Sequence, residues 1–221
     1  MKKKKVVALI PIKLQSQRVK NKNLRPLGNH ELCWYVPNTL LESNLIDEVY
    51  IFCSDEKVMK YVPKGCIFLK RDTSLDSNET KGFQIYESFI KQIVADVYIL
   101  AHTTSPFLKL ESLNDAIARV LSGEYDSSFS AKKIQTFAWY QGKPINYDIA
   151  NVPRTQDMEP ILVETSAFFI FNNYIFTEHG RRIGFQPYIK EVDDIEAIDI
   201  DEEQDLVYAQ TIKNLEDKNN E

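Results

Sequence analysis

Glycine is scarce in this sequence. The 221 residues include only 7 glycines, at Gly28, Gly65, Gly82, Gly123, Gly142, Gly180 and Gly184. None of them has the spacing of the G-x-G-x-x-G dinucleotide fingerprint or of the Walker phosphate loop. A standard Rossmann oxidoreductase site and a P-loop are therefore excluded, and any phosphate site in this chain needs another device.

Cysteine and long apolar runs are scarce as well. Three cysteines without a Cys-x-x-Cys spacing argue against disulfides and a zinc ribbon, and they favour a reducing, cytoplasmic location. The longest apolar runs are too short to cross a bilayer, and the run after the basic start is too short for a signal peptide. A net charge of −5 argues against a general nucleic-acid binder. We expect neither a membrane nor nucleic acid as a partner.

The apolar pattern predicts an α/β fold. Strands are predicted over 5–12, 48–53, 66–69, 96–101, 127–131 and 166–171, and helices over 34–43, 83–94, 110–121 and 204–215. Their alternation indicates one domain over 1–221, with a doubly wound, mostly parallel, Rossmann-like sheet. Between about 135 and 164 the pattern gives way to polar, aromatic and proline residues, which predicts a protruding extension.

A cluster of cations follows the first predicted strand. Lys13, Arg18, Lys20 and Lys22 lie in one loop with the polar side chains of Ser16, Gln17, Asn21 and Asn23. In open α/β sheets ligands bind beyond the carboxyl ends of the strands, and a triphosphate needs dense positive charge and hydrogen-bond donors. The loop is therefore a candidate triphosphate site, and a solvated basic turn is the alternative.

Two carboxylates near the carboxyl end of the chain have metal-ligand spacing. If Ile198–Asp201 is a strand, Asp199 and Asp201 point to the same side while both isoleucines face the core. Such a pair suits Mg²⁺ or Mn²⁺, which prefers oxygen ligands and bridges substrate phosphates. The alternative is that Asp201 caps the last helix, and both roles are compatible.

These motifs together resemble the acylneuraminate cytidylyltransferases, which make CMP-sugar acids and belong to the nucleotidyltransferase superfamily. The family opens with Ile-Pro-Ala-Arg-Gly-Gly-Ser-Lys-Arg and continues to Lys-Asn and Pro-Leu-Gly. This chain keeps Ile10, Pro11, Ser16, Arg18, Lys22, Asn23, Pro26, Leu27 and Gly28. It departs at Ile12-Lys13, at Leu14-Gln15 in place of two glycines, and at Gln17.

The resemblance implies roles for particular residues. Lys13, Arg18 and Lys22 would hold the triphosphate as catalytic residues, and Asp199 and Asp201 would bind the metal. The residues that would bind the nucleotide are Ile12, Ser16, Asn23, Arg71, Thr80, Gly82 and Thr104. The residues that would face the acceptor are His102, Arg154, Gln156, Glu164 and Phe168. His102 would offer positive charge to an anionic acceptor, while Phe168 and Phe169 have core packing as their alternative.

The implied reaction transfers CMP from CTP to an acidic acceptor and releases pyrophosphate. A 2-keto sugar acid is the first expectation for the acceptor, and a phosphonate or a phosphorylated small molecule is the second. A non-catalytic sugar-nucleotide-binding protein is the alternative from another class. The aromatic cluster of Phe137, Trp139, Tyr140 and Tyr147 fits a homodimer interface in the 135–164 extension.

Overall fold

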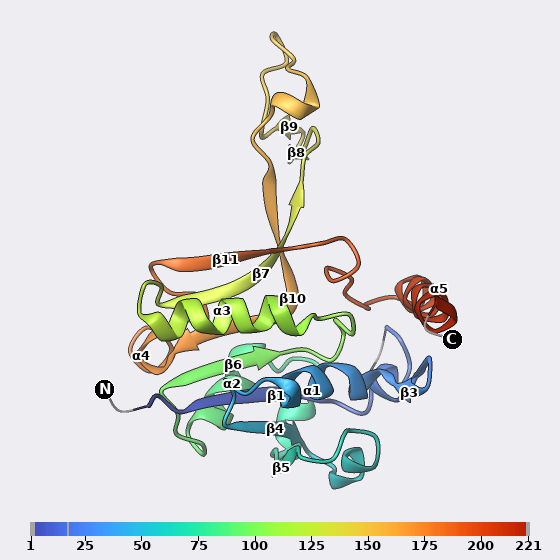
Figure 1. Ribbon diagram of the computed structural model, residues 1–221, viewed down its shortest axis with the longest axis vertical. Helices are drawn as coiled ribbons and strands as arrows, with labels where there is room; N and C mark the ends of the chain where they lie inside the picture. The colour runs from blue at the N-terminus through green and yellow to red at the C-terminus, as the bar shows by residue number, and fades with distance from the viewer. Residues whose placement is uncertain (1–2, 17, 220–221) are drawn as a thin grey trace.

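A seven-stranded sheet forms the centre of the computed structural model, which describes residues 3–16 and 18–219 (Figure 1). Its strands are β1 (Val6–Pro11), β4 (Glu48–Cys53), β5 (Ile67–Lys70), β6 (Val97–Ala101), β7 (Ser127–Ile134), β10 (Ile161–Asn172) and β11 (Pro187–Val192). They lie in the order β11-β7-β10-β6-β1-β4-β5. Strand β10 runs antiparallel to both of its neighbours, while the other neighbouring pairs are parallel.

Helices cover both faces of this sheet. Because side chains alternate along a strand, Ala8 and Ile10 face α1 (Leu32–Glu42) and α3 (Leu110–Ser122), and these residues share one core cluster. Val7 and Leu9 face an aromatic-rich core cluster with α2 (Gly82–Ile90) and α4 (Asn173–Thr177). The result is the doubly wound, mostly parallel α/β sheet predicted from the sequence.

A third, smaller core joins the two ends of the chain. Val19 in the loop after β1 packs with Ile200 and with Leu206 of α5 (Glu203–Asn219). Leu27 of the hairpin β2 (Pro26–Leu27) and β3 (His30–Glu31) belongs to the same cluster. Short 3-10 turns lie at Lys22–Leu24, Glu56–Lys60, Thr73–Asp76 and Thr155–Asp157. This core places the loop after β1 next to the segment that precedes α5.

The segment between β7 and β10 projects away from the sheet (Figure 1). The outer parts of β7 and β10 pair as a ribbon, from Glu164 opposite Ala131 to Ile161 opposite Ile134. The small hairpin β8 (Trp139–Tyr140) and β9 (Lys143–Pro144) lies beyond it. Within the described part of the chain, no helix is both long and apolar enough to span a membrane.

Phe168 has a structural position that excludes its expected contact with the acceptor. It lies opposite Ala101 in the β10–β6 pair, and its side chain is 0% exposed within the core on the α1 and α3 face. Phe169 points to the opposite face and is only 2% exposed. The expectation that Phe168 walls the acceptor site is wrong, because core packing takes up the whole ring.

We predict that Phe168→Ala destabilises the fold by about 3–5 kcal/mol, because truncating a buried ring leaves a cavity. Urea unfolding followed by circular dichroism measures the change. Phe185→Ala is the matched control, since that ring is 63% exposed, and it should cost less than about 1 kcal/mol. Equal costs for the two variants would contradict the burial described above.

Candidate active site

The loop of residues 13–25 follows β1 and is held in shape by its own polar groups. The Ser16 hydroxyl donates to the carbonyl of Val19 at 2.5 Å and accepts the Lys22 backbone N–H at 2.7 Å. Val19 is 0% exposed and anchors the loop in the small core. Ser16 therefore stabilises the conformation of the loop through bonds to its backbone, and these bonds do not use the side chains of the cationic residues. Gln17 lies outside the described residues.

Asn23 fastens this loop to the end of β6. Its side chain is buried, with Nδ2 donating to the Lys13 carbonyl at 2.8 Å. Its Oδ1 accepts the Thr103 hydroxyl at 2.6 Å. Both ends of the amide are therefore used within the protein, and Asn23 fixes the backbone where a cradle for phosphates would form.

Arg71 fastens the same region from the other side. Its side chain is almost fully buried just after β5, and its Nη2 donates to the Ile12 carbonyl at 3.0 Å. Nη2 also donates to Asp76 at 2.6 Å, while Nη1 donates to the Phe52 carbonyl at 3.3 Å. A buried guanidinium thus joins the carboxyl ends of β1 and β4 to the 72–80 segment. Within the described residues, the Nε atom has no hydrogen-bond partner.

Two adjoining hollows border the loop. The larger, about 640 Å³, lies between residues 13–16 and the segments around Ser54 and Ser77. The smaller, about 220 Å³, also involves Arg18 and Lys22. Lys13 lines both, and its Nζ donates to Asn78 at 2.8 Å. The predicted triphosphate loop therefore borders open space on its cationic side.

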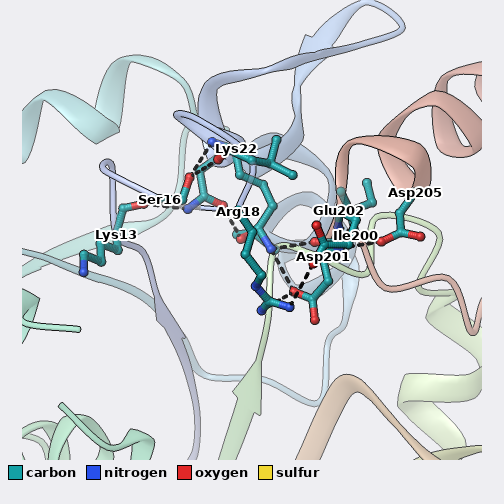
Figure 2. A network of polar contacts seen from close by, with 11 residues as sticks. Lys13, Ser16, Arg18, Lys22, Ile200, Asp201, Glu202 and Asp205 are labelled. Carbon is teal, nitrogen blue, oxygen red and sulfur yellow. Dashed lines mark hydrogen bonds and ion pairs between the residues drawn. The ribbon is translucent and has the colours of Figure 1, made fainter. Parts of the chain in front are cut away.

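Two cations of the loop, Arg18 and Lys22, meet Asp201 in an ion-pair network (Figure 2). Lys22, whose side chain is 12% exposed, donates to the Ile200 carbonyl at 2.5 Å and to Asp201 at 3.1 Å. Arg18 is 59% exposed and pairs with the same Asp201 oxygen at 2.9 Å. Burial alone would raise the pKa of Asp201, but Lys22 and Arg18 outweigh it, so the pKa lies below its usual range.

The segment around Asp199 is not the strand that was expected. The two-residue alternation that would place both aspartates on one side therefore does not apply. The Ile200 N–H bonds to the carbonyl of Thr104, and Ile200 is fully buried, whereas Ile198 is only partly so. Asp205 also accepts the N–H groups of Asp201 and Glu202, so it is Asp205 that caps the start of α5.

Asp199 has a carboxylate oxygen that fits a cation. Oδ1 of Asp199 is buried and has no hydrogen-bond partner among the described residues. An unpaired buried carboxylate oxygen is costly, and binding a metal ion would remove that cost. Within residues 3–16 and 18–219, no three His, Cys, Asp or Glu residues group as a metal cluster. The protein could thus offer Asp199 and Asp201, with a nucleotide and waters completing the shell.

His102 follows β6 and is neutral rather than positive. Burial lowers its pKa, and although the bond to Ser166 and the charge of Asp199 raise it, Arg182 and Lys22 lower it further. Its Nδ1–H donates to the Ser166 carbonyl at 2.7 Å, so Nε2 carries the lone pair. The expectation that His102 offers positive charge to the acceptor is therefore wrong at neutral pH.

Comparison with known proteins settles the family. The sequence profile described as "Cytidylyltransferase" matches residues 7–220. The chain belongs to this cytidylyltransferase family. N-acylneuraminate cytidylyltransferase A of Danio rerio is 25% identical over 219 residues, covering 95% of this chain and 51% of that protein. The N-acylneuraminate cytidylyltransferase of Streptococcus agalactiae is 20% identical over 216 residues, covering 93% and 52%. The chain spans about half the length of the curated relatives it matches.

A solved structure shows the same fold. CMP:2-keto-3-deoxy-manno-octonic acid synthetase complexed with CTP superposes with a TM-score of 0.73 at 14% identity, covering 96% of this chain and 99% of the other. In this member of the cytidylyltransferase family, Leu14 packs against the core where the resemblance led us to expect a glycine. A side chain at that position is therefore accommodated by burial, and the loop keeps its shape through Ser16 and Asn23.

The remaining predicted nucleotide residues lie at strand and helix ends. Gly82 begins α2, and a Cβ there would lie 2.7 Å from the Tyr86 hydroxyl, so a larger residue would displace the Tyr86 side chain. Thr80 precedes it and is partly buried. Thr104 contributes its backbone carbonyl to the 198–202 segment. Their contact with a base stays a prediction.

The predicted acceptor residues do not come together within one copy of the chain. Arg154 and Gln156 are exposed on the extension, where Arg154 pairs with Asp157 at 2.7 Å. Glu164 lies on the ribbon close to the sheet and reaches Arg182 at 3.5 Å. Sequence reasoning missed Arg182, Tyr86 and Asp76, because each lies outside the motifs and gains its place by folding. Of these three, Asp76 could have been expected, because an arginine that is buried requires an acidic partner.

We predict that Asn23→Ala destabilises the protein by about 1–3 kcal/mol, because it leaves the Thr103 hydroxyl and the Lys13 carbonyl without partners. It should also raise the Kd for CTP, since the loop loses its fastening. Thermal unfolding and calorimetric titration with CTP measure the two effects. Asn38→Ala is the control, because the Asn38 side chain donates to Glu42 on the same helix at 2.7 Å. Equal changes in stability and in CTP affinity for the two variants would contradict this role of Asn23.

Proposed function

We propose that this protein transfers CMP from CTP to the hydroxyl of an acidic acceptor, a 2-keto sugar acid, and releases pyrophosphate. One observation supports this most directly. Arg18 and Lys22 of the cationic loop, which follows β1, pair with the carboxylate of Asp201, in a chain of the cytidylyltransferase family. The relatives that carry the name N-acylneuraminate cytidylyltransferase point to the sugar acid.

The protein's own residues supply position and charge. In this proposal Lys13, Arg18 and Lys22 bind the triphosphate and stabilise the charge of the leaving pyrophosphate. Asn23 and Arg71 hold the carbonyls around the nucleotide in place, and rigid placement of two reactants is itself a large part of such catalysis. Neutral His102 offers its Nε2 lone pair to the hydroxyl of the acceptor, which lets it accept a proton during attack.

A divalent cation is part of this proposal, and the carboxylates of Asp199 and Asp201 are the residues that would bind it. Asp199, with its unpaired buried oxygen, and Asp201 would hold it. A bound Mg²⁺ or Mn²⁺ would polarise the α-phosphate. The Arg18 and Lys22 pairs keep Asp201 ionised and oriented towards the loop.

The first test is pyrophosphate release from CTP with a panel of N-acetylneuraminate, 2-keto-3-deoxy-manno-octonic acid, a phosphonate and a sugar phosphate. We expect turnover with the sugar acids, and Asp199→Asn should lower kcat/KM at least about 100-fold, which corresponds to about 2.7 kcal/mol. Asp194→Asn is the control, because that side chain is 85% exposed.

The other outcomes of this test would exclude the metal assignment, the sugar-acid acceptor or the catalytic activity. Unchanged turnover in both Asp199→Asn and Asp201→Asn would remove the metal assignment. Turnover with a phosphorylated acceptor alone would favour a second candidate function, the transfer of CMP to a phosphorylated small molecule. The structural neighbour 4-diphosphocytidyl-2C-methyl-D-erythritol synthase of Anaerococcus prevotii, which superposes with a TM-score of 0.62, is the reason for considering this function. CTP binding without any turnover would indicate a non-catalytic sugar-nucleotide-binding protein.

We further propose that the extension forms a homodimer. Beyond the ribbon it exposes Trp139 (55%), Tyr140 (65%), Ile145 (57%), Ile149 (62%) and Val152 (57%). Such a patch of aromatic and branched side chains is typical of an interface. Arg154 and Gln156 lie on the same extension, which projects away from the sheet and so from His102 at the end of β6. In a dimer, the extension of one copy would bring its Arg154 and Gln156 to the acceptor site of the other copy.

The oligomeric state tests this. Light scattering at micromolar concentration should give twice the chain mass, and the double variant Trp139→Ser, Tyr140→Ser should give the monomer with an unchanged circular dichroism spectrum. Tyr174→Ser, which changes a 41% exposed tyrosine outside the extension, should stay dimeric. A monomeric mass for the unaltered protein would contradict the proposed homodimer.

A further inference from the structure

Arg182 is a cation close to His102 and Glu164, two of the predicted acceptor residues, and no sequence motif contains it. It lies in the connection between α4 and β11, and its guanidinium carbon stands 3.7 Å from the centre of the Phe169 ring. The same ring meets His102 edge-on, with 6.4 Å between the ring centres. Phe169 therefore holds Arg182 on the α2 face of the sheet, close to the end of β6.

Most of the hydrogen-bonding capacity of Arg182 remains available for a ligand. The guanidinium carries five N–H donors. Its ion pair with Glu164 is long, at 3.5 Å, and the two side chains are 37% and 49% exposed. Stacking on an aromatic ring uses the flat face and leaves the N–H edge open, and that edge matches a carboxylate with two parallel hydrogen bonds.

Arg182 also lines a hollow of about 350 Å³. Besides Arg182, it is lined by Phe83, Tyr86 and Phe176 with Gly82 and Gly180. Tyr86 is 9% exposed, and its hydroxyl occupies the space that a side chain at Gly82 would need. Burial raises the pKa of Tyr86 while the neighbouring Arg182 charge opposes that rise, so the hydroxyl stays protonated. The hollow thus combines aromatic walls with one cation and one hydroxyl.

Two cations and one carboxylate act on His102. Arg182 and Lys22 lower the pKa of His102, while the charge of Asp199 raises it. Lys22 is engaged with Ile200 and Asp201 in the nucleotide loop. Arg182 is therefore the cation placed to meet an anionic group on the acceptor side.

We propose that Arg182, with the Tyr86 hydroxyl beside it, binds the carboxylate of the acceptor and selects acids over neutral sugars. This assignment rests on the proposed cytidylyltransferase activity and adds the residue that determines acceptor class. The aromatic walls contact the carbon skeleton of the acceptor, and Glu164 keeps the guanidinium from swinging into solvent. Arg182 is a specificity residue that touches substrate and does not take part in the chemical step.

The experiment compares one accepted sugar acid with its carboxamide as acceptors, at saturating CTP. Arg182→Met should raise the KM for the acid about ten- to hundredfold, the range expected for charge-assisted hydrogen bonds. The KM for CTP should change less than about twofold, and the preference for acid over amide should disappear. Arg182→Lys should keep part of the preference, because it keeps the charge and loses the two-pronged geometry.

Arg181→Met provides a matched control at the neighbouring position. The Arg181 guanidinium lies 4.6 Å from the Phe185 ring and donates to the Gly184 carbonyl, outside the hollow. It should leave both KM values unchanged. Tyr86→Phe, which keeps the packing, should raise the KM for the acid a few-fold, so the test does not depend on Arg182→Met folding well.

The outcomes separate this inference from the proposed function. Turnover by the unaltered protein with unchanged acid-over-amide preference in Arg182→Met and Tyr86→Phe overturns the role of Arg182 alone. A rise in the KM for CTP with no change for the acid places Arg182 in the base site and also overturns it. No pyrophosphate release by the unaltered protein with any acid overturns both proposals.

Discussion

The bond network between Lys22 and the 200–201 segment is the constraint on which the rest of the site depends. It joins residues that are 178 and 179 positions apart in the chain. Beneath it, Val19, Ile200 and Leu206 form a small core that fixes the two segments independently of charge. Because the apolar contact sets the distance, the ion pairs above it have a defined geometry, and a partly buried pair is screened less by salt than one on an open surface.

The shape of the loop depends on buried side chains that bind backbone carbonyls. Asn23 and Arg71 hold the carbonyls of Lys13 and Ile12, two consecutive residues at the start of the loop. In a glycine-rich loop the backbone can approach a phosphate closely because no Cβ intervenes. Here Leu14 is partly buried against the core, and the buried side chains of Asn23 and Arg71 fix the backbone of a loop that lacks glycine.

The acceptor side shows a comparable exchange of roles. A histidine at the end of a buried strand has its pKa lowered by loss of solvent, and it donates its Nδ1 proton to a carbonyl. Positive charge on that side is carried by Arg182, which stays partly exposed and is oriented by the Phe169 ring. In the proposed reaction, neutral His102 accepts a proton from the acceptor, and Arg182 binds the carboxylate of the acceptor.

The sequence by itself determined the layers of the fold and the place of the site. Alternating apolar runs predicted β4 with its observed bounds and α3 to within one residue, since burial on both faces leaves a strong periodic signal. It missed β11, in which the charged side chains of Lys190 and Glu191 interrupt the apolar pattern, and it treated Ile198–Asp201 as a strand. Only the tertiary structure decided which side chains meet. The burial of Phe168, the neutrality of His102, the carbonyl partners of Arg71 and the position of Arg182 depend on packing between separate segments of the chain, and no local pattern encodes that packing.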